Sequence, residues 1–399
     1  MRVLKTNAAR LTGILSLFLL VACVTPRISL PEEVQKQARV ANFEKTLIRI
    51  WGDATDEEVD QERIRTAPPL KIVVDKKTGI KRQDFLVLSG GGAKGAYGAG
   101  LLNGWTESGN RPEFSIVTGV STGAIIAPFA FMGPKYDRFL TEFYTTYSTK
   151  DLVRPIGLGS ILGGVLGGSS VADPKPLTKL IARYITPQFL REIAAEHASG
   201  RYLLIGTTNL DAQRPVIWNM GEIAKRGDDK ALALFRSIIL ASTSIPGAFP
   251  PVLIDVAAAG EVGQELHVDG GTTDNAILVP IHLKLKDTEN ERNQKIARRL
   301  FVVVNSNLAP KRKVIKASTI SIATRSIDTL IKQQTAGDVL RLYGYSKVNK
   351  IEFNYTEIPD SFDKKPTELF DKEYMRALYN IGELAGKNDV IWRSVPRGL

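Results

Sequence analysis

The sequence predicts an α/β fold with a largely parallel central sheet. Short apolar runs typical of strands recur between residues 84 and 307, and segments with helical spacing of apolar residues lie between many of them. This alternation is typical of a parallel sheet that helices cover on both faces. The chain has 399 residues, of which 43% are apolar and 24% are charged, so it can bury a large core and is not expected to be disordered.

Six of the apolar runs are expected to be strands. They are "DFLVLS" at 84–89, "FSIVTG" at 114–119, "RYLLIGTTN" at 201–209, "RPVIWNM" at 214–220, "ELHVDGG" at 265–271 and "RLFVVVNSN" at 299–307. Each is rich in the β-branched, aromatic or large aliphatic residues that strands favour. We therefore place the main domain at residues 84–306.

The segments on either side of the main domain are expected to contain amphipathic helices. In residues 23–83 one such helix, followed by a linker, is predicted by apolar side chains at helical spacing, namely Val40, Phe43, Leu47 and Ile50. Residues 307–399 are expected to be a helical extension that packs on the main domain. Its segments 319–335 and 372–387 have the pattern of amphipathic helices that cover the sheet.

The N-terminus has the pattern of an export signal. Three basic residues among the first ten precede an apolar stretch, residues 11–21, that is too short to span a bilayer. The only cysteine, Cys23, follows directly on "LLVA", which resembles the lipobox of bacterial lipoproteins. Residues 1–22 are therefore interpreted as a lipoprotein signal peptide. Alternatively, Cys23 is a small apolar residue at the end of a signal cleaved elsewhere or of an uncleaved anchor.

The lipobox resemblance implies a membrane anchor. It implies cleavage before Cys23 and acylation of its thiol and of the new amino terminus, and several acyl chains together give stable anchoring. Val24 follows the cysteine where an aspartate could stand, which resembles the outer-membrane sorting pattern of bacteria with two membranes. We therefore expect a lipoprotein of the bacterial outer membrane.

The charge balance favours a lipid partner over a nucleic acid. The formal net charge is +11, and a basic protein at a membrane is attracted to anionic headgroups. Nucleic-acid binding would require a basic cluster with interleaved aromatic residues, whereas the lysines and arginines here are scattered. No nucleic-acid partner is expected.

The segment 154–170, "RPIGLGSILGGVLGGSS", is rich in glycine and large aliphatic residues and carries no charge after Arg154. Two interpretations stay open at this point. It is either a mobile flap that contacts acyl chains or a membrane, or a buried glycine-rich connection.

A glycine-rich turn, "SGGGAKG" at 89–95, follows the first expected strand. Gly90, Gly92 and Gly95 fit the G-x-G-x-x-G pattern of dinucleotide binding, but the next strand ends without the acidic residue that would hold a ribose. A phosphate-binding P-loop requires Ser or Thr after the lysine, and Lys94 is followed by glycine. The turn is therefore not expected to hold a nucleotide.

The second expected strand leads into the pattern G-x-S-x-G. Gly119 and Gly123 flank Ser121, with apolar "FSIV" before them and apolar "AIIAPFAF" after them. A nucleophile elbow needs this strand, sharp turn and helix, with small residues on both sides of the serine. Ser121 is thus the predicted nucleophile, with a simple helix N-cap as the alternative.

A serine that attacks an ester creates an oxyanion, which backbone N–H groups at a helix N-terminus can stabilise. The glycine turn offers such groups because glycines let the backbone approach a substrate closely. The turn and the elbow should face one crevice, since the carboxyl ends of neighbouring parallel strands meet at one edge of the sheet. The expected oxyanion hole comprises Gly90, Gly91, Gly92, Lys94 and Gly95.

Asp269 and His282 are the two candidates for the general base. The pattern "LHVDGG" suggests a strand that delivers Asp269 into a Gly-Gly turn, whereas His282 would complete the Ser, Asp, His order of an α/β-hydrolase. His267 is expected to pack beside Asp269, and His197 to lie on the surface of a polar helix. No cysteine or histidine cluster has the spacing of metal ligands, so no metal or cofactor is expected.

Taken together, three motifs resemble the patatin-like phospholipases. "SGGGAKGAYGAG", "GVSTGA" and "VDGG" occur in the order and spacing of that family, and residues 241–252 resemble the segment between its last two motifs. The resemblance covers about residues 84–306. Ser89 and Lys94 stand where the plant-type motif has Asp and Arg. The resemblance implies a three-layer α/β/α fold with a mostly parallel central sheet.

The resemblance also implies a function. Ser121 and Asp269 would form a catalytic dyad without a histidine, and the protein would be a lipid acyl hydrolase that cleaves ester bonds of phospholipids or related lipids through an acyl-enzyme. The alternative is a membrane-anchored lipoprotein scaffold that binds lipid or a partner without turnover. The intact Ser121, Asp269 and glycine turn favour the enzyme.

Overall fold

The computed structural model describes residues 27–35, 37–55, 58, 68–75, 78–155, 172–277, 296–388 and 392–399. Several sequence positions discussed above lie outside these residues. They are the signal peptide with Cys23, residues 156–170 of the glycine-rich segment, and His282. The expectations for them stay predictions.

The described residues form a mixed sheet of eleven strands. Its main path runs β1, β10, β11, β8, β5, β4, β12, β13, while β9 pairs with β8, β2 with β9, and β3 with β4. The strands are β1 (Arg39–Val40), β2 (Arg49–Trp51), β3 (Val73–Val74), β4 (Lys81–Leu88), β5 (Ile116–Val120), β8 (Tyr202–Asn209), β9 (Arg214–Asn219), β10 (Val252–Ala258), β11 (Glu261–Asp269), β12 (Ala297–Val304) and β13 (Glu352–Glu357).

The centre of the sheet is parallel. Strands β8, β5, β4, β12 and β13 run in one direction, and β9, β10 and β11 extend the sheet with antiparallel pairing. β5 and β8 are buried along their whole length, as expected of parallel strands with helices on both faces. All six predicted strands are present, and the predicted α/β class is confirmed.

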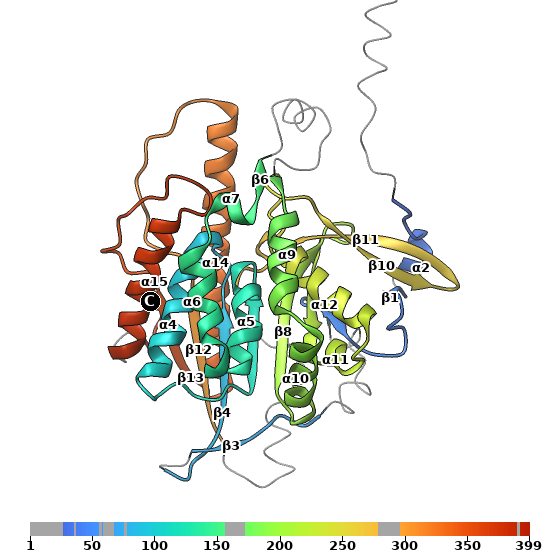
Figure 1. Cartoon of the computed structure of the whole chain (residues 1–399), viewed down its shortest axis with the longest axis horizontal. Helices are drawn as coiled ribbons and strands as arrows, with labels where there is room; N and C mark the ends of the chain where they lie inside the picture. Colours follow the sequence, from blue (N-terminus) through green and yellow to red (C-terminus); the bar gives the residue numbers. More distant parts are fainter. Residues whose placement is uncertain are drawn as a thin grey trace, which may run out of the picture.

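Alternate side chains of the sheet point into two separate cores. On β4, Leu86 and Leu88 pack into one core with most of the helices, whereas Phe85 and Val87 pack into a second core with α14. Figure 1 shows α4, α5, α6 and α15 side by side in one helical layer. The longer helices are α4 (Ala96–Glu107), α5 (Thr122–Met132), α6 (Asp137–Thr146), α9 (Lys175–Tyr184), α10 (Pro187–Ala198), α12 (Asp229–Ser242), α14 (Thr319–Val348) and α15 (Lys372–Asn388). The predicted three-layer α/β/α arrangement is thus confirmed.

Several short elements connect or flank this framework. They are α2 (Glu32–Gln35), η1 (Gly92–Gly95), η2 (Pro134–Tyr136), α7 (Thr149–Leu152), β6 (Arg154–Pro155), β7 (Ala172–Asp173), α11 (Met220–Lys225) and η3 (Gly270–Thr272).

Within the described ranges, none of the helices combines the length and the apolar composition that crossing a bilayer requires.

Helix α15 packs on α4 with direct contact between the two backbones. A Cβ atom added to Gly104 would lie 1.9 Å from the carbonyl oxygen of Glu383, and one added to Gly382 would lie 2.1 Å from that of Tyr97. Only a residue without a side chain permits so close an approach. The second predicted C-terminal helix is therefore part of the helical layer over the sheet.

The C-terminal segment is not only helical, contrary to the expectation. It also supplies β13, which pairs in parallel with β12 and extends the same sheet. Phe353 and Tyr355 of β13 are buried in the second core beside Leu342 of α14. The alternating apolar residues of β13 thus have the period of a strand with one buried face.

The amphipathic helix predicted around Val40 to Ile50 is wrong. This segment contains two short strands instead, in which Val40 pairs with Val256 and Ile50 with Ile217. Between them Asn42 has a φ of 70°, which a right-handed helix does not allow. The spacing of the apolar residues fits a helix. However, the edge strands β9 and β10 have backbone N–H and C=O groups that need partners, and the β-branched residues Val40 and Ile50 favour the strand conformation that pairs with them.

Candidate active site

Ser121 lies in the sharp turn between β5 and α5. Its φ of 55° and ψ of −124° are rare for a residue with a side chain, and such strain costs about 1–3 kcal/mol. A Cβ atom on Gly119 would lie 2.3 Å from the carbonyl oxygen of Gly123, and one on Gly123 would lie 2.2 Å from that of Leu88. Both glycines are therefore required for the turn, and the strand, turn and helix predicted around Ser121 are present.

A second serine holds this turn in place. The Ser121 N–H donates to Ser242 Oγ at 2.9 Å, and the Ser242 hydroxyl donates to the carbonyl oxygen of Gly206 on β8 at 2.7 Å. Ser121 is only 5% exposed and caps the N-terminus of α5. The partial positive charge at a helix N-terminus stabilises negative charge on the Ser121 oxygen.

Asp269 is the last residue of β11, and η3 follows it, as the sequence predicts. Its backbone is fixed on both sides, because its N–H donates to the Ser244 carbonyl at 2.9 Å and its carbonyl accepts from the Thr208 hydroxyl at 3.1 Å. Its Oδ1 accepts the N–H of Gly271 at 2.8 Å. Its Oδ2 is buried and has no hydrogen-bond partner among the described residues.

The Asp269 carboxyl and the Ser121 hydroxyl face each other. Burial raises the pKa of Asp269 to about 7, while the Ser121 hydroxyl and the Gly271 N–H act in the opposite direction. The hydroxyl thus lies near enough to favour the carboxylate, although no bond of regular geometry reaches Oδ2. Hydrogen bonds between a nucleophile and its base are often long before substrate binds. A carboxyl that titrates near neutral pH beside a serine is suited to accept the serine proton.

The glycine turn packs directly on the elbow. A Cβ atom on Gly90 would lie 3.0 Å from Ser121 Cβ, and one on Gly95 would lie 2.1 Å from Thr122 Oγ1. The structure therefore brings the turn, the elbow and Asp269 to the carboxyl ends of β4, β5 and β11. The turn and the elbow thus meet at neighbouring strand ends, where the sequence places them.

Not every N–H group of the turn is free. The N–H of Gly90 donates to the Asn275 carbonyl at 3.1 Å, and the N–H of Lys94 donates to the Gly91 carbonyl at 3.2 Å. Within the described part of the chain, the N–H groups of Gly91 and Gly92 have no acceptor. They stand at the start of η1, where unpaired donors are available to an anion. Gly92 has a φ of +59°, a conformation that glycine adopts readily.

Two asparagines that the sequence analysis did not identify hold the glycine turn. Asn305, just after β12, donates its N–H to Ser89 Oγ at 2.9 Å and its side-chain amide to the Ser89 carbonyl at 2.8 Å. Asn275 donates its amide to Thr335 on α14 at 2.6 Å, besides accepting from Gly90. The polar residues that follow "VDGG" and the strand "LFVVV" were the only signal for them.

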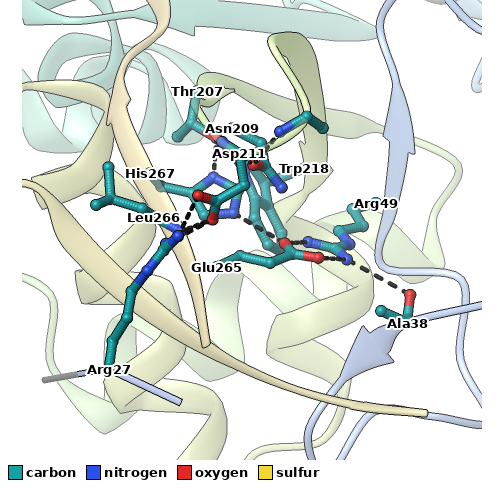
Figure 2. Close-up of polar contacts among 11 residues, drawn as sticks. Arg27, Ala38, Arg49, Thr207, Asn209, Asp211, Trp218, Glu265, Leu266 and His267 are labelled. Atoms are coloured by element: carbon teal, nitrogen blue, oxygen red, sulfur yellow. Dashed lines mark hydrogen bonds and ion pairs between the residues drawn. The ribbon is translucent and has the colours of Figure 1, made fainter. Parts of the chain in front are cut away.

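A buried polar network surrounds Glu265 and His267 on β11, the strand that ends at Asp269 (Figure 2). His267 Nδ1 lies 3.0 Å from Thr207 Oγ1 and His267 Nε2 lies 3.1 Å from Glu265 Oε2, while Trp218 Nε1 donates to Thr207 at 2.8 Å. Because the Glu265 carboxylate can only accept, Nε2–H donates to it, and Nδ1 of the neutral ring accepts the hydroxyl proton of Thr207. Burial lowers the pKa of His267, so the ring is neutral. Arg49 completes the network with a bidentate ion pair to Glu265.

The expectation that His197 lies at the surface is wrong. Its side chain is fully buried, with Nδ1 3.0 Å from the Arg201 carbonyl and Nε2 2.9 Å from Glu222. The ring lies against Gly221, where a Cβ atom would come within 2.3 Å of it. The polar helix around His197 gave no sign of this contact, because α11 lies elsewhere in the sequence.

Comparison with known proteins identifies the family to which the central part of the chain belongs. Residues 86–283, about half of the chain, match the model of the patatin-like phospholipase family. No curated protein matches the chain significantly. Among solved structures, the crystal structure of VipD from Legionella pneumophila is similar, with 12% sequence identity over 85% of this chain and 72% of that chain and a TM-score of 0.39. The family match spans the glycine turn, Ser121 and Asp269, and residues 86–283 are therefore a patatin-like phospholipase domain, with lipid acyl ester hydrolysis as the activity of that family in general.

Proposed function

We propose that the protein is a serine hydrolase that cleaves carboxylic ester bonds of phospholipids or related acyl lipids, with Ser121 as the nucleophile and Asp269 as the general base. The observation that carries this proposal is the strained Ser121 beside a buried Asp269 carboxyl whose Oδ2 has no hydrogen-bond partner among the residues that the structure describes. We also propose that a lipidated Cys23 anchors the protein in a bacterial membrane, the outer membrane in a species that has two.

The proposed reaction has two halves. Asp269 takes the proton of Ser121 as its oxygen attacks the ester carbonyl, and the N–H groups of Gly91 and Gly92 stabilise the oxyanion. Asp269 then donates this proton to the departing alcohol, which leaves an acyl group on Ser121. A water molecule gives its proton to Asp269 and attacks the acyl-enzyme, and the fatty acid leaves as Ser121 regains the proton.

This proposal predicts release of fatty acid from phospholipid vesicles by the wild type and none above background by Ser121→Ala. Lipid mass spectrometry of a mixed bacterial phospholipid extract, before and after incubation, measures both products. A fluorophosphonate should label Ser121 in the wild type, and peptide mapping locates the label. Labelling of Ser121→Ala to the same extent, or an unchanged lipid extract with the wild type, would contradict the proposal and favour the scaffold.

The proposal also predicts how activity depends on pH. Since the base must be a carboxylate and burial raises the pKa of Asp269 to about 7, kcat/KM for a soluble neutral ester should rise tenfold per pH unit up to about pH 7 and then level off. The measurement is the initial rate between pH 5 and 9. His267→Gln and His282→Ala should keep this profile, and loss of the rise in His282→Ala would assign it to the histidine.

The raised pKa of Asp269 also predicts how its substitution affects the stability of the fold. The folded-state pKa of Asp269 lies above the usual 3.8, so the native state holds this proton more tightly and loses stability as the pH rises from about 4 to 7. Asp269→Asn carries no charge to bury. It should therefore unfold at a temperature no lower than the wild type at pH 8, which separates loss of the base from loss of the fold.

A further inference from the structure

A cavity of about 620 Å³ lies beside the glycine turn. Gly90, Gly91 and Lys94 of the glycine turn line it, and so does Asn275, whose carbonyl accepts the N–H of Gly90. The rest of its lining comes from residues 306–312 after β12, the first half of α14, and residues 358–374. Most of this lining lies outside residues 86–283, so the family match does not describe it.

The lining of the cavity is strongly basic. Asp328 and Asp363 are its only acidic residues within the described chain. Its basic residues are Lys94, Lys311, Arg312, Arg325, Lys332, Lys364 and Lys365. Groups of one sign in a concave site concentrate ions of the opposite sign. The lining therefore has an excess of positive charge that favours an anion.

Few of these cations are neutralised by the described residues. The one ion pair recorded among the described lining residues joins Arg325 to Asp328 at 3.2 Å. Lys311 and Lys364 donate to backbone carbonyls, at 3.3 and 2.8 Å. Lys332 also donates to a backbone carbonyl, that of Ala309.

Lys332 is held close to other cations. Burial lowers its pKa, and so do the nearby charges of Lys311, Lys94 and Arg325, whereas Asp328 raises it. The charges of Lys311, Lys94 and Arg325 therefore repel the Lys332 ammonium group. A bound anion would relieve that repulsion.

The segment that contributes Lys311 to Lys332 to the cavity also has exposed apolar side chains. Val314 is 85% exposed, and Ile322 and Leu330 on the first half of α14 are 49% and 68% exposed. Figure 1 shows this half of α14 projecting beyond the sheet. Exposed apolar side chains beside basic residues suit the surface of an anionic lipid layer.

We infer that this cavity binds the phosphate group of an anionic phospholipid while its ester lies at Ser121, so that the enzyme prefers phospholipids of net negative charge. The inference rests on the proposed ester hydrolysis. Gly90 both lines the cavity and packs on Ser121, and only the glycerol backbone separates the phosphate of a phospholipid from its ester groups. A zwitterionic headgroup would bring a cation into a site that is already positive.

Soluble dihexanoyl phospholipids, kept below their aggregation limit, test the cavity apart from membrane binding. The wild type should hydrolyse dihexanoyl phosphatidylglycerol at least about tenfold faster, in kcat/KM, than dihexanoyl phosphatidylcholine. Arg312→Gln with Lys332→Gln should remove about tenfold or more of this preference, because hydrogen bonds to charged groups are the stronger ones. Hydrolysis of a neutral short-chain ester should not change.

A matched pair of substitutions gives the control. Lys313 and Lys316 are exposed and follow Arg312 in the segment that leads to α14, but they do not line the cavity. Lys313→Gln with Lys316→Gln should keep the preference for phosphatidylglycerol. An equal loss in this control pair, or no preference in the wild type, would overturn the inference and leave the proposed hydrolysis intact.

Binding separates the two proposals from each other. Calorimetry with the Ser121→Ala protein should show tighter binding of dihexanoyl phosphatidylglycerol than of phosphatidylcholine, and Arg312→Gln with Lys332→Gln should weaken it about tenfold. This result stands even if the wild type hydrolyses no ester. Tight binding of inorganic phosphate together with equal binding of both lipids would mean a site for the free ion and would overturn the inference.

Discussion

Replacing Asp269 with asparagine should lower kcat/KM for ester hydrolysis by about 10²- to 10⁴-fold, the range that a general base typically contributes. Asparagine keeps the size of the side chain but cannot take the proton of Ser121. Initial rates with a soluble neutral ester at pH 8 measure the loss. Ser121→Ala should lose at least as much, since no nucleophile remains.

Two further variants test whether the site is a dyad. Ser121 and Asp269 act as one unit, so the double variant should be hardly slower than either single variant. His282→Ala should retain most of the activity, as should His267→Gln, because the His267 ring is bound to Thr207 and Glu265. If His282→Ala, shown to be folded by circular dichroism, is as inactive as Ser121→Ala, a histidine belongs to the catalytic unit and the dyad is wrong.

Replacing Arg49 with methionine should lower the free energy of unfolding by about 3–5 kcal/mol at pH 7. The side chains of Arg49 and Glu265 are only 12% and 4% exposed, so the substitution leaves a buried carboxylate without its ion-pair partner. Denaturant unfolding of the wild type and the variant measures the difference. Glu265→Leu in the Arg49→Met background should restore much of the loss, because no buried charge remains.

The loss in unfolding free energy caused by Arg49→Met should depend on pH. Despite its burial, Glu265 has its pKa lowered to about 2, because Arg49 and His267 stabilise the carboxylate. A folded-state pKa below the usual 4.5 gives stability that is complete above about pH 4.5 and is lost as the pH falls towards 2. The difference between wild type and Arg49→Met should shrink over that window. A deficit that does not change with pH would mean that lost packing on Trp51 and Trp218 causes it.

Arg214 provides a matched control for Arg49. It also stacks on Trp51, but its ion-pair partners Asp53 and Glu58 are 50% and 43% exposed. Exposed ion pairs contribute about 0–1 kcal/mol. Arg214→Met should therefore cost much less than Arg49→Met at pH 7 and should show no comparable change between pH 4.5 and 2.

The sequence alone determined the features that depend on neighbouring residues. The strand before Ser121, the glycines two positions to either side of it and the apolar helix after it are local requirements of a sharp turn, and all appear in one stretch of the chain. The position of Asp269 at the end of a strand and before two glycines is local in the same sense. So are the apolar runs of the buried parallel strands and the amphipathic patterns of α14 and α15.

Only the tertiary structure decided which distant residues meet, because a local pattern contains no record of sheet register or of helix packing. The spacing of Val40 and Ile50 fits a helix, yet in the structure they belong to two strands that pair with β10 and β9. Arg49 and Glu265 are 216 residues apart and meet because β2 and β11 belong to one sheet. The basic cavity arises in the same way, since α14 and the segments after β12 and β13 come together beside the glycine turn only once the sheet has formed.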